Sequence, residues 1–298
     1  MPLHLHDHGG EGPPLLLLHG AGRSLADWEA TAPLLTPHHR VLAADLPAHG
    51  RSGVGAVEPW TFDSAVAAVE ETLRAHDVPD AILVGHSLGG MLAAVYADRH
   101  PGMTPGVVDL DGVWWDAAES YEGEERASRE RMDEMVRAGG GQVAPAGYVT
   151  QQVAYAQQFG IPAARAEASA RASAVELPDG RWQTLPERER WLELIDALDG
   201  LDLFATLRRL TCPLLVVVGR RAQPAAPGME WFEKLTATHM RRKEAELAQL
   251  VSERPTARTV DLDATHAMLL EEPEAVARAV LAFTRPLPSS PGRLSSTG

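Results

Sequence analysis

Short, nearly continuous apolar runs recur along the chain and are separated by longer segments with a helical pattern. The runs lie at 14–18, 40–45, 81–85, 106–110, 213–218 and 258–262. Val and Leu dominate them, as is expected of parallel strands that are covered on both faces. Segments 62–76 and 87–99, which lie between runs, place their apolar residues at helical spacing. This alternation predicts an α/β fold with a doubly wound, mostly parallel sheet.

Residues 113–205 interrupt the alternation. No convincing strand is evident there, and charge-rich helical segments such as 123–138 replace the apolar runs. We therefore expect a helical insertion into a core formed by residues 1–112 and 206–284. Segment 229–252 is a longer amphipathic helix than such a fold requires. It could form a rim of the site or a contact between copies of the chain.

Composition narrows the class of protein. Acidic residues outnumber basic ones, 41 to 27, so neither a nucleic acid nor an anionic membrane is an expected partner. The single cysteine, Cys212, excludes an internal disulfide and suits a reducing compartment. No signal peptide is visible, and the run at 15–18 is too short to cross a bilayer. A cytoplasmic protein is therefore expected, with a disordered tail over residues 285–298.

The third apolar run ends in a G-x-S-x-G pentapeptide. Gly85, Ser87 and Gly89 occupy its fixed positions, and an Ala-rich helical segment follows at once. So tight a strand-to-helix turn strains the serine backbone, exposes its hydroxyl at the sheet edge and needs glycines where a Cβ would collide. The helix also directs its positive dipole end at negative charge on a substrate oxygen. This context indicates a nucleophile at Ser87 rather than an ordinary glycine-rich turn.

Three further motifs, in the same order and spacing, resemble those of the α/β-hydrolase superfamily. Residues 15–22, with Trp28 downstream, resemble its oxyanion loop. Residues 45–52 resemble its D-x-P-G-H-G-x-S turn, with Ala48 in place of a glycine, and residues 263–273 resemble its histidine loop. The resemblance implies that the insertion is a helical cap over an active site. It also implies leading antiparallel strands, for which only a short N-terminal segment is available.

The resemblance implies a catalytic set around Ser87. A serine hydroxyl needs a base within hydrogen-bond reach, and His266 lies where the superfamily carries that base. Most relatives place the acid after the fifth apolar run, but residues 219–224 read GRRAQP and contain no carboxylate. A subset of the superfamily places it after the preceding strand, where Asp111 lies at the carboxyl end. Asp111 is therefore the predicted acid. The alternatives are Asp109, Asp116, Asp263 and Glu230.

Backbone N–H groups are expected to bind the substrate oxyanion, because such donors are rigidly placed. Leu88, directly after the nucleophile, supplies one, and by the resemblance Ala21 supplies the other. The candidate pocket residues are His86, inside the pentapeptide, and the cap residues Trp114 and Trp115. The alternative for both tryptophans is a place in the hydrophobic core of the cap itself.

These residues predict a cofactor-independent serine hydrolase that cleaves a carboxylic ester or lactone of a small, fairly apolar molecule. The aromatic cap favours a polyketide-like ester or macrolactone. No motif for a metal or a nucleotide occurs in the sequence. A thioesterase, an acyltransferase or a carbon–carbon hydrolase would use the same residues. A non-catalytic binding protein with this fold would instead explain the absent late acid. The sequence leaves a homodimer open.

Overall fold

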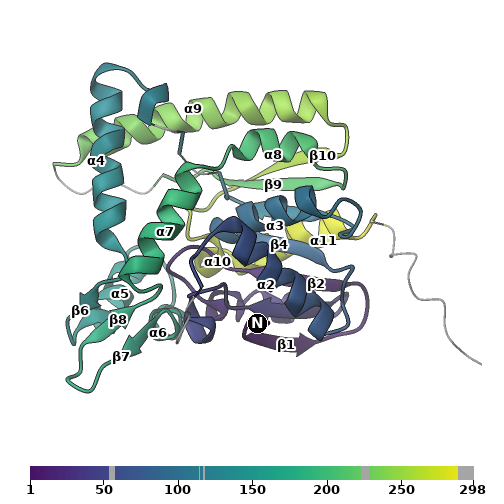
Figure 1. Cartoon of the computed structure of the whole chain (residues 1–298), viewed down its shortest axis with the longest axis horizontal. Coiled ribbons are helices and arrows are strands. Elements are labelled where there is room, and N and C mark those ends of the chain that lie inside the picture. The colour runs from purple at the N-terminus through teal and green to yellow at the C-terminus, as the bar shows by residue number, and fades with distance from the viewer. Residues whose placement is uncertain (54–57, 114, 117, 223–227, 288–298) are drawn as a thin grey trace, which may run out of the picture.

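The computed structural model describes residues 1–53, 58–113, 115–116, 118–222 and 228–287. At its centre is a seven-stranded sheet with the strand order β1-β3-β2-β4-β5-β9-β10 (Figure 1). The strands are β1 (Leu5–Gly9), β2 (Pro14–Leu18), β3 (Arg40–Ala44), β4 (Ile82–His86), β5 (Val107–Leu110), β9 (Leu214–Gly219) and β10 (Ala257–Leu262). β1 is antiparallel to β3, and the other neighbouring strands are parallel. The predicted α/β fold with a mostly parallel sheet is confirmed, and the expected leading antiparallel element is one strand.

Each face of the sheet has its own apolar core, because successive residues of a strand point to opposite sides. Leu16 and Leu18 of β2 belong to one core, and Leu15 and Leu17 belong to the other. The first face is covered by α2 (Phe62–Ala75), α3 (Leu88–Arg99), α8 (Leu203–Arg209) and part of α9 (Glu230–Glu253), and the second by α1 (Ala32–Leu35), α10 (Met268–Glu271) and α11 (Pro273–Thr284). Because helices cover both faces of the sheet, a ligand site is expected at the carboxyl ends of the parallel strands.

The chain between β5 and α8 lies to one side of the central sheet (Figure 1). Its helices are α4 (Gly123–Gly139), α5 (Tyr148–Gln157), α6 (Ala163–Ala172) and α7 (Arg188–Asp199). It also contains a small antiparallel sheet of β6 (Val143–Ala144), β8 (Trp182–Thr184) and β7 (Ala174–Glu176). The expectation of an insertion without strands is wrong in this respect. Strands of two or three residues are too short to show an alternating pattern.

Helix α9 corresponds to the long helix expected at 229–252, and it joins the insertion to the core (Figure 1). Near its N-terminus Leu235 packs in a cluster with Met132 of α4. Near its C-terminus Leu247 and Leu250 enter the first core. None of the helices in the described part of the chain has both the length and the apolar character needed to span a bilayer.

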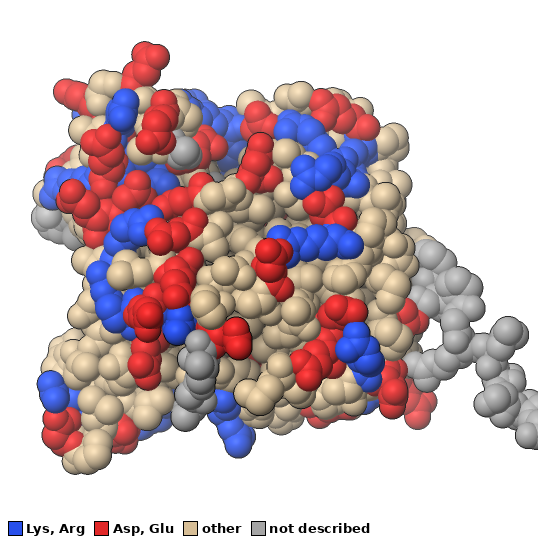
Figure 2. All heavy atoms as spheres, viewed as in Figure 1, with Lys and Arg blue, Asp and Glu red and all other residues tan. Residues whose placement is uncertain are grey.

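Acidic and basic side chains are intermixed on the face of the molecule drawn in Figure 2. Ion pairs join some of the charged residues of the described chain. Arg208 contacts Glu246 and Glu253, and Arg209 contacts Asp98.

Candidate active site

Ser87 occupies the sharp turn between β4 and α3, with φ 52° and ψ −119°. The two glycines of the pentapeptide make this turn possible. A Cβ at Gly85 would lie 2.1 Å from the carbonyl carbon of Gly89. A Cβ at Gly89 would lie 2.3 Å from the carbonyl oxygen of Leu18. Any larger residue would therefore break the turn that holds the serine at the sheet edge in a strained conformation, as in a nucleophile elbow.

His266 follows β10, and its imidazole contacts a carboxylate from another strand end. The Nδ1 atom of His266 lies 2.8 Å from Oδ2 of Asp111, which directly follows β5. An Nδ1–H that donates to this carboxylate leaves Nε2 as the proton acceptor, which is the tautomer a general base requires. Ser87 and His266 line the same two cavities. The structure thus brings together the three residues predicted as nucleophile, base and acid.

The alternative acids are placed elsewhere. Asp109 is buried within β5, where its Oδ1 accepts the N–H of Gly112 at 2.8 Å. Asp116 and Asp263 face arginines, and Glu230 accepts a backbone N–H near the start of its own helix.

Asp109 and Asp111 are two residues apart but have opposite electrostatic surroundings. Burial raises the pKa of Asp109 to about 7, and the neighbouring Asp111 adds to this rise. Burial would also raise the pKa of Asp111, but its hydrogen bond with His266 and the charge of Lys243 hold that pKa well below its usual range. Asp111 is therefore ionised at neutral pH, as an acid that orients an imidazole must be.

Lys243 of α9 is the residue at this site that the sequence reasoning missed. Its Nζ lies 2.5 Å from Oδ1 of Asp111, and its side chain is only 3% exposed. Each carboxylate oxygen of Asp111 therefore has its own partner, Lys243 on one side and His266 on the other. A signal was available, because Lys234 and Lys243 are the only lysines in a chain with 27 basic residues. A compact ammonium suits a narrow buried position that a planar guanidinium would not fit.

The loop that carries His266 is held on both sides. Glu271, with a side chain 2% exposed, accepts the N–H of Thr265 at 2.8 Å and its hydroxyl at 2.5 Å. On the other side, Nε2 of His86 donates to the carbonyl of His266 at 2.8 Å. Burial, with a contribution from His266, lowers the pKa of His86 to about 4, so its ring remains neutral. His86 thus fixes the loop in addition to lining the first cavity.

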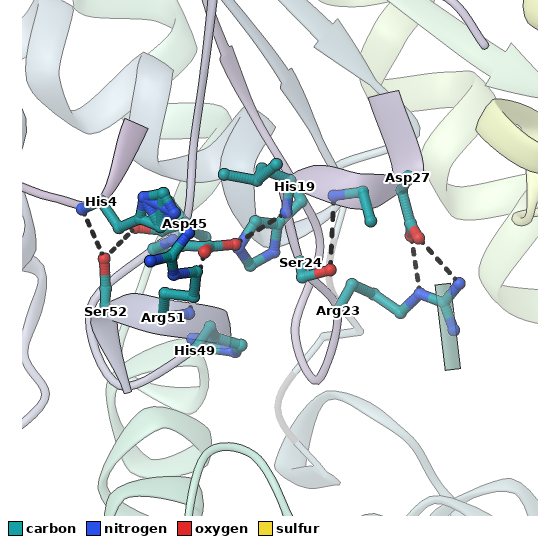
Figure 3. A network of polar contacts seen from close by, with 12 residues as sticks. His4, His19, Arg23, Ser24, Asp27, Asp45, His49, Arg51 and Ser52 are labelled. Carbon is teal, nitrogen blue, oxygen red and sulfur yellow. Dashed lines mark hydrogen bonds and ion pairs between the residues drawn. The ribbon is translucent and has the colours of Figure 1, made fainter. Parts of the chain in front are cut away.

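A polar network holds the loop after β2 (Figure 3). Nε2 of His19 accepts the N–H of Leu46 at 2.9 Å, and Nε2 of His49 accepts the N–H of Gly22 at 3.0 Å. Burial lowers the pKa of His49 to about 4 and that of His19 well below its ordinary value. Both histidines therefore remain neutral acceptors that fix the loop, rather than bases.

The two predicted oxyanion residues lie beside the serine. Ala21 belongs to the loop held by this network and lines a cavity together with Ser87. Leu88 is the first residue of α3, so its N–H is among those that a helix leaves unpaired at its start. The two residues thus come from separate elements that both reach the region of Ser87.

Two cavities open onto Ser87 and His266. The first, of about 260 Å³, lies between the loop after β2 and helices α5 and α6, with Tyr155 and Phe159 in its wall. The second, of about 340 Å³, is bordered by α9 and the chain after β5 and β9. Both volumes lie near the lower end of the range for small-molecule sites.

The predicted pocket residues fall into different cavities. His86 lines the first cavity and Trp115 the second, while Trp114 lies outside the described residues. The Trp115 ring packs at a tilt against the His239 ring of α9, with 4.3 Å between ring centroids. By contrast, Trp182 is buried in a small cluster of the insertion's own core. One aromatic residue of the insertion thus lines a cavity, while another belongs to the insertion's own hydrophobic core.

This sheet, with a serine at the turn after β4 and a histidine after β10, defines an α/β-hydrolase. The chain belongs to the α/β-hydrolase superfamily, and residues 13–121 match a family model described as alpha/beta hydrolase fold. A crystal structure of E-2-(acetamidomethylene)succinate hydrolase matches with a TM-score of 0.72 and 23% identity, over 94% of each chain. An enol-lactonase from Burkholderia xenovorans matches with a TM-score of 0.62 and 20% identity, over 94% of this chain and 95% of that one.

Curated relatives match at higher identity over shorter spans. A pimeloyl-[acyl-carrier protein] methyl ester esterase of Methylococcus capsulatus is 29% identical over 71% of this chain and 77% of its own. The corresponding esterase of Aeromonas hydrophila is 40% identical, but over 31% of this chain and 35% of its own. An acetyltransferase component of Pseudomonas putida is covered over only 25% of its length. The two esterases among these relatives support a hydrolytic α/β-hydrolase without specifying its substrate.

Proposed function

We propose that the protein is a cofactor-independent serine hydrolase that cleaves a carboxylic ester or lactone of a small, fairly apolar molecule. The observation that carries this proposal is the contact between His266 and Asp111, at 2.8 Å, beside the strained Ser87. A serine, a base within reach of it and a third group that orients the base are the parts that nucleophilic acyl transfer requires. Esterases and a lactonase among the relatives support the same bond class.

The reaction proceeds in two halves. Ser87 Oγ attacks the carbonyl carbon while Nε2 of His266 takes the hydroxyl proton, and Asp111 stabilises the resulting imidazolium. The N–H groups of Ala21 and Leu88 bind the oxyanion as the carbonyl double bond opens. The tetrahedral intermediate then collapses, and His266 gives its proton to the departing alkoxide. Water attacks the acyl-serine by the same route in reverse, which releases the acid and restores Ser87.

The two cavities divide the substrate at the bond to be broken. Each cavity reaches both Ser87 and His266, so one accepts the acyl group and the other the alcohol. Two small compartments of about 260 and 340 Å³ suit an ester with two modest substituents. They suit a large macrolactone less well, because a macrocycle needs a single open chamber.

Labelling with a fluorophosphonate probe, followed by peptide mapping, tests the proposal. We expect the adduct on Ser87, and we expect Ser87→Ala to lose both labelling and ~10³–10⁶-fold of its activity on short p-nitrophenyl esters. Ser252→Ala, at an exposed position of α9, is the matched control. Labelling at another serine would refute the assignment. A folded protein that is neither labelled nor active would favour the non-catalytic binding protein.

A further inference from the structure

Arg23 extends into the first cavity from the loop that carries Ala21. Its Nε donates to Oδ2 of Asp27 at 2.7 Å, and its Nη2 donates to Oδ1 of Asp27 at 3.1 Å (Figure 3). The same Nη2 donates to the hydroxyl of Ser169 on α6. The guanidinium is thus fixed from both the core and the insertion, so its orientation is set before any substrate binds.

The contacts among Arg23, Asp27 and Ser169 leave N–H donors of the guanidinium free, whereas both carboxylate oxygens are already bonded. A guanidinium has five N–H donors, of which Asp27 and Ser169 occupy three. Both N–H groups of Nη1 lack a hydrogen-bond partner within the described part of the chain. Asp27 is occupied on both oxygens, because the Ser169 hydroxyl also donates to it. A molecule that enters this cavity therefore meets unpaired donors from Arg23 and an already satisfied carboxylate.

Because the rest of the cavity wall is mostly apolar, these donors favour a ligand that has an apolar chain and a polar end group. The apolar residues of this wall include Phe159, Ile161 and Leu270. An acyl chain can pack against this wall, whereas a polar group has Nη1 as a strong partner at its end. Asp27 cancels most of the charge of Arg23 as seen from far away. A group in direct contact with Nη1 instead meets N–H donors, which favour a hydrogen-bond acceptor.

We propose that Arg23 binds a carboxylate at the far end of the acyl group, so that the preferred substrates are monoesters of short dicarboxylic acids. This inference rests on the proposed hydrolase function and adds the substrate class to it. The acyl half is assigned to this cavity because Arg23 lies two residues after Ala21, on the loop that binds the acyl carbonyl oxygen. The cavity volume of about 260 Å³ has room for a short acyl chain that ends in a carboxylate.

Matched pairs of esters test the assignment. In monomethyl glutarate and methyl valerate, or monomethyl succinate and methyl butyrate, a carboxylate replaces a methyl group on the same chain. A hydrogen bond to a charged group contributes enough to change kcat/KM by about ten- to hundredfold. We therefore expect the wild-type protein to prefer the charged ester of each pair by that factor. Arg23→Gln should remove the preference, so that kcat/KM falls about ten- to hundredfold more for the charged ester of a pair than for the neutral one.

Two further variants distinguish a specific loss of carboxylate binding from a general effect of misfolding. Ser169→Ala removes one contact of the guanidinium but keeps Arg23, so we expect a smaller loss that is again confined to the charged esters. Arg171→Gln, on the same helix but exposed, is the control and should change neither ester. Equal losses on both esters of a pair, or a preference that survives Arg23→Gln, would overturn the assignment. So would an Arg23-dependent preference for a carboxylate on the alcohol side, as in the butyric ester of glycolate.

Binding of glutarate, measured by calorimetry, separates this inference from the hydrolase proposal. Glutarate should bind the wild-type protein more tightly than valerate does, and Arg23→Gln should abolish the difference. This result with no ester cleavage would overturn the hydrolase proposal but not the carboxylate site. If the protein cleaves neutral esters but binds glutarate and valerate equally tightly, the carboxylate site would be overturned and the hydrolase proposal would stand.

Discussion

Lys243 and His266 hold opposite oxygens of Asp111, with Nζ at 2.5 Å from Oδ1 and Nδ1 at 2.8 Å from Oδ2. The carboxylate cannot rotate without breaking one of these contacts. The cation thus fixes the carboxylate that orients the imidazole.

Lys243→Met should therefore lower kcat by about tenfold or more, as when a group that orients a catalytic ligand is removed. Steady-state kinetics on one ester measures the loss of kcat, and the melting temperature of the variant shows whether the fold is retained. Lys234→Met, at an exposed position of the same helix, should match the wild type. A lower melting temperature with an unchanged kcat would mean that Lys243 contributes only to packing.

Asp109 and Asp111 should respond to the same substitution in opposite ways. Asp111→Asn preserves the shape of the side chain but favours the wrong imidazole tautomer, so kcat should fall by up to ~10⁴. Asp109→Asn should retain activity, since Asp109 bonds to the N–H of Gly112 and an amide oxygen can also accept that bond. Steady-state kinetics on one ester measures kcat for both variants. Comparable losses in both variants would contradict the assignment of the acid.

The stability of Asp109→Asn should exceed that of the wild type, with a margin that depends on pH. Burial raises the pKa of Asp109 from 3.8 to about 7, so between these values the unfolded chain binds fewer protons than the folded one. Wild-type stability consequently falls as the pH rises through this window and is not lowered further above it. Melting temperatures at several pH values should show a gain for Asp109→Asn that grows through the window and then levels off. A constant gain would contradict the buried-carboxyl explanation.

Trp115 and Trp182 offer a comparison between a cavity wall and a core. Trp115→Ala should alter selectivity among esters, because the ring lines the second cavity and supports His239. Trp182→Ala should lower the free energy of unfolding by ~3–5 kcal/mol and leave selectivity intact, because it empties a buried cluster. Denaturation curves and a panel of esters measure the two effects. The reverse pattern would place Trp115 in the structural core.

Glu271 should affect the reaction without touching the substrate. It accepts both the N–H and the hydroxyl of Thr265, which directly precedes His266. Glu271→Ala frees this turn, so we expect a lower kcat with little change in KM. Glu272→Ala, next to it but far more exposed, is the control. A KM effect without a kcat effect would argue against a role in holding the His266 loop.

The parts of the site that the sequence predicted have local signals. The pentapeptide around Ser87 needs its glycines within the same turn, and the end of β5 at Leu110 separates Asp111 from Asp109 within a few residues. The contact of Lys243 with Asp111 spans 132 positions. It depends on how α9 is rotated against the core, which no local pattern specifies. The strands β6 to β8 were missed because they are so short. The catalytic roles themselves stay predictions.

The division of the site between core and insertion has an evolutionary consequence. Ser87, Asp111 and His266 all follow strands of the central sheet, whereas α5 and α6 supply the outer wall of the first cavity. The chemistry therefore lies in one part of the chain and the outer cavity wall in another. A transplant of the segment from α5 to α6 between relatives would change that wall without rebuilding the chemistry. Arg23 belongs to the core and would stay bound to Asp27, but a foreign segment without a hydroxyl at position 169 would remove one of its contacts.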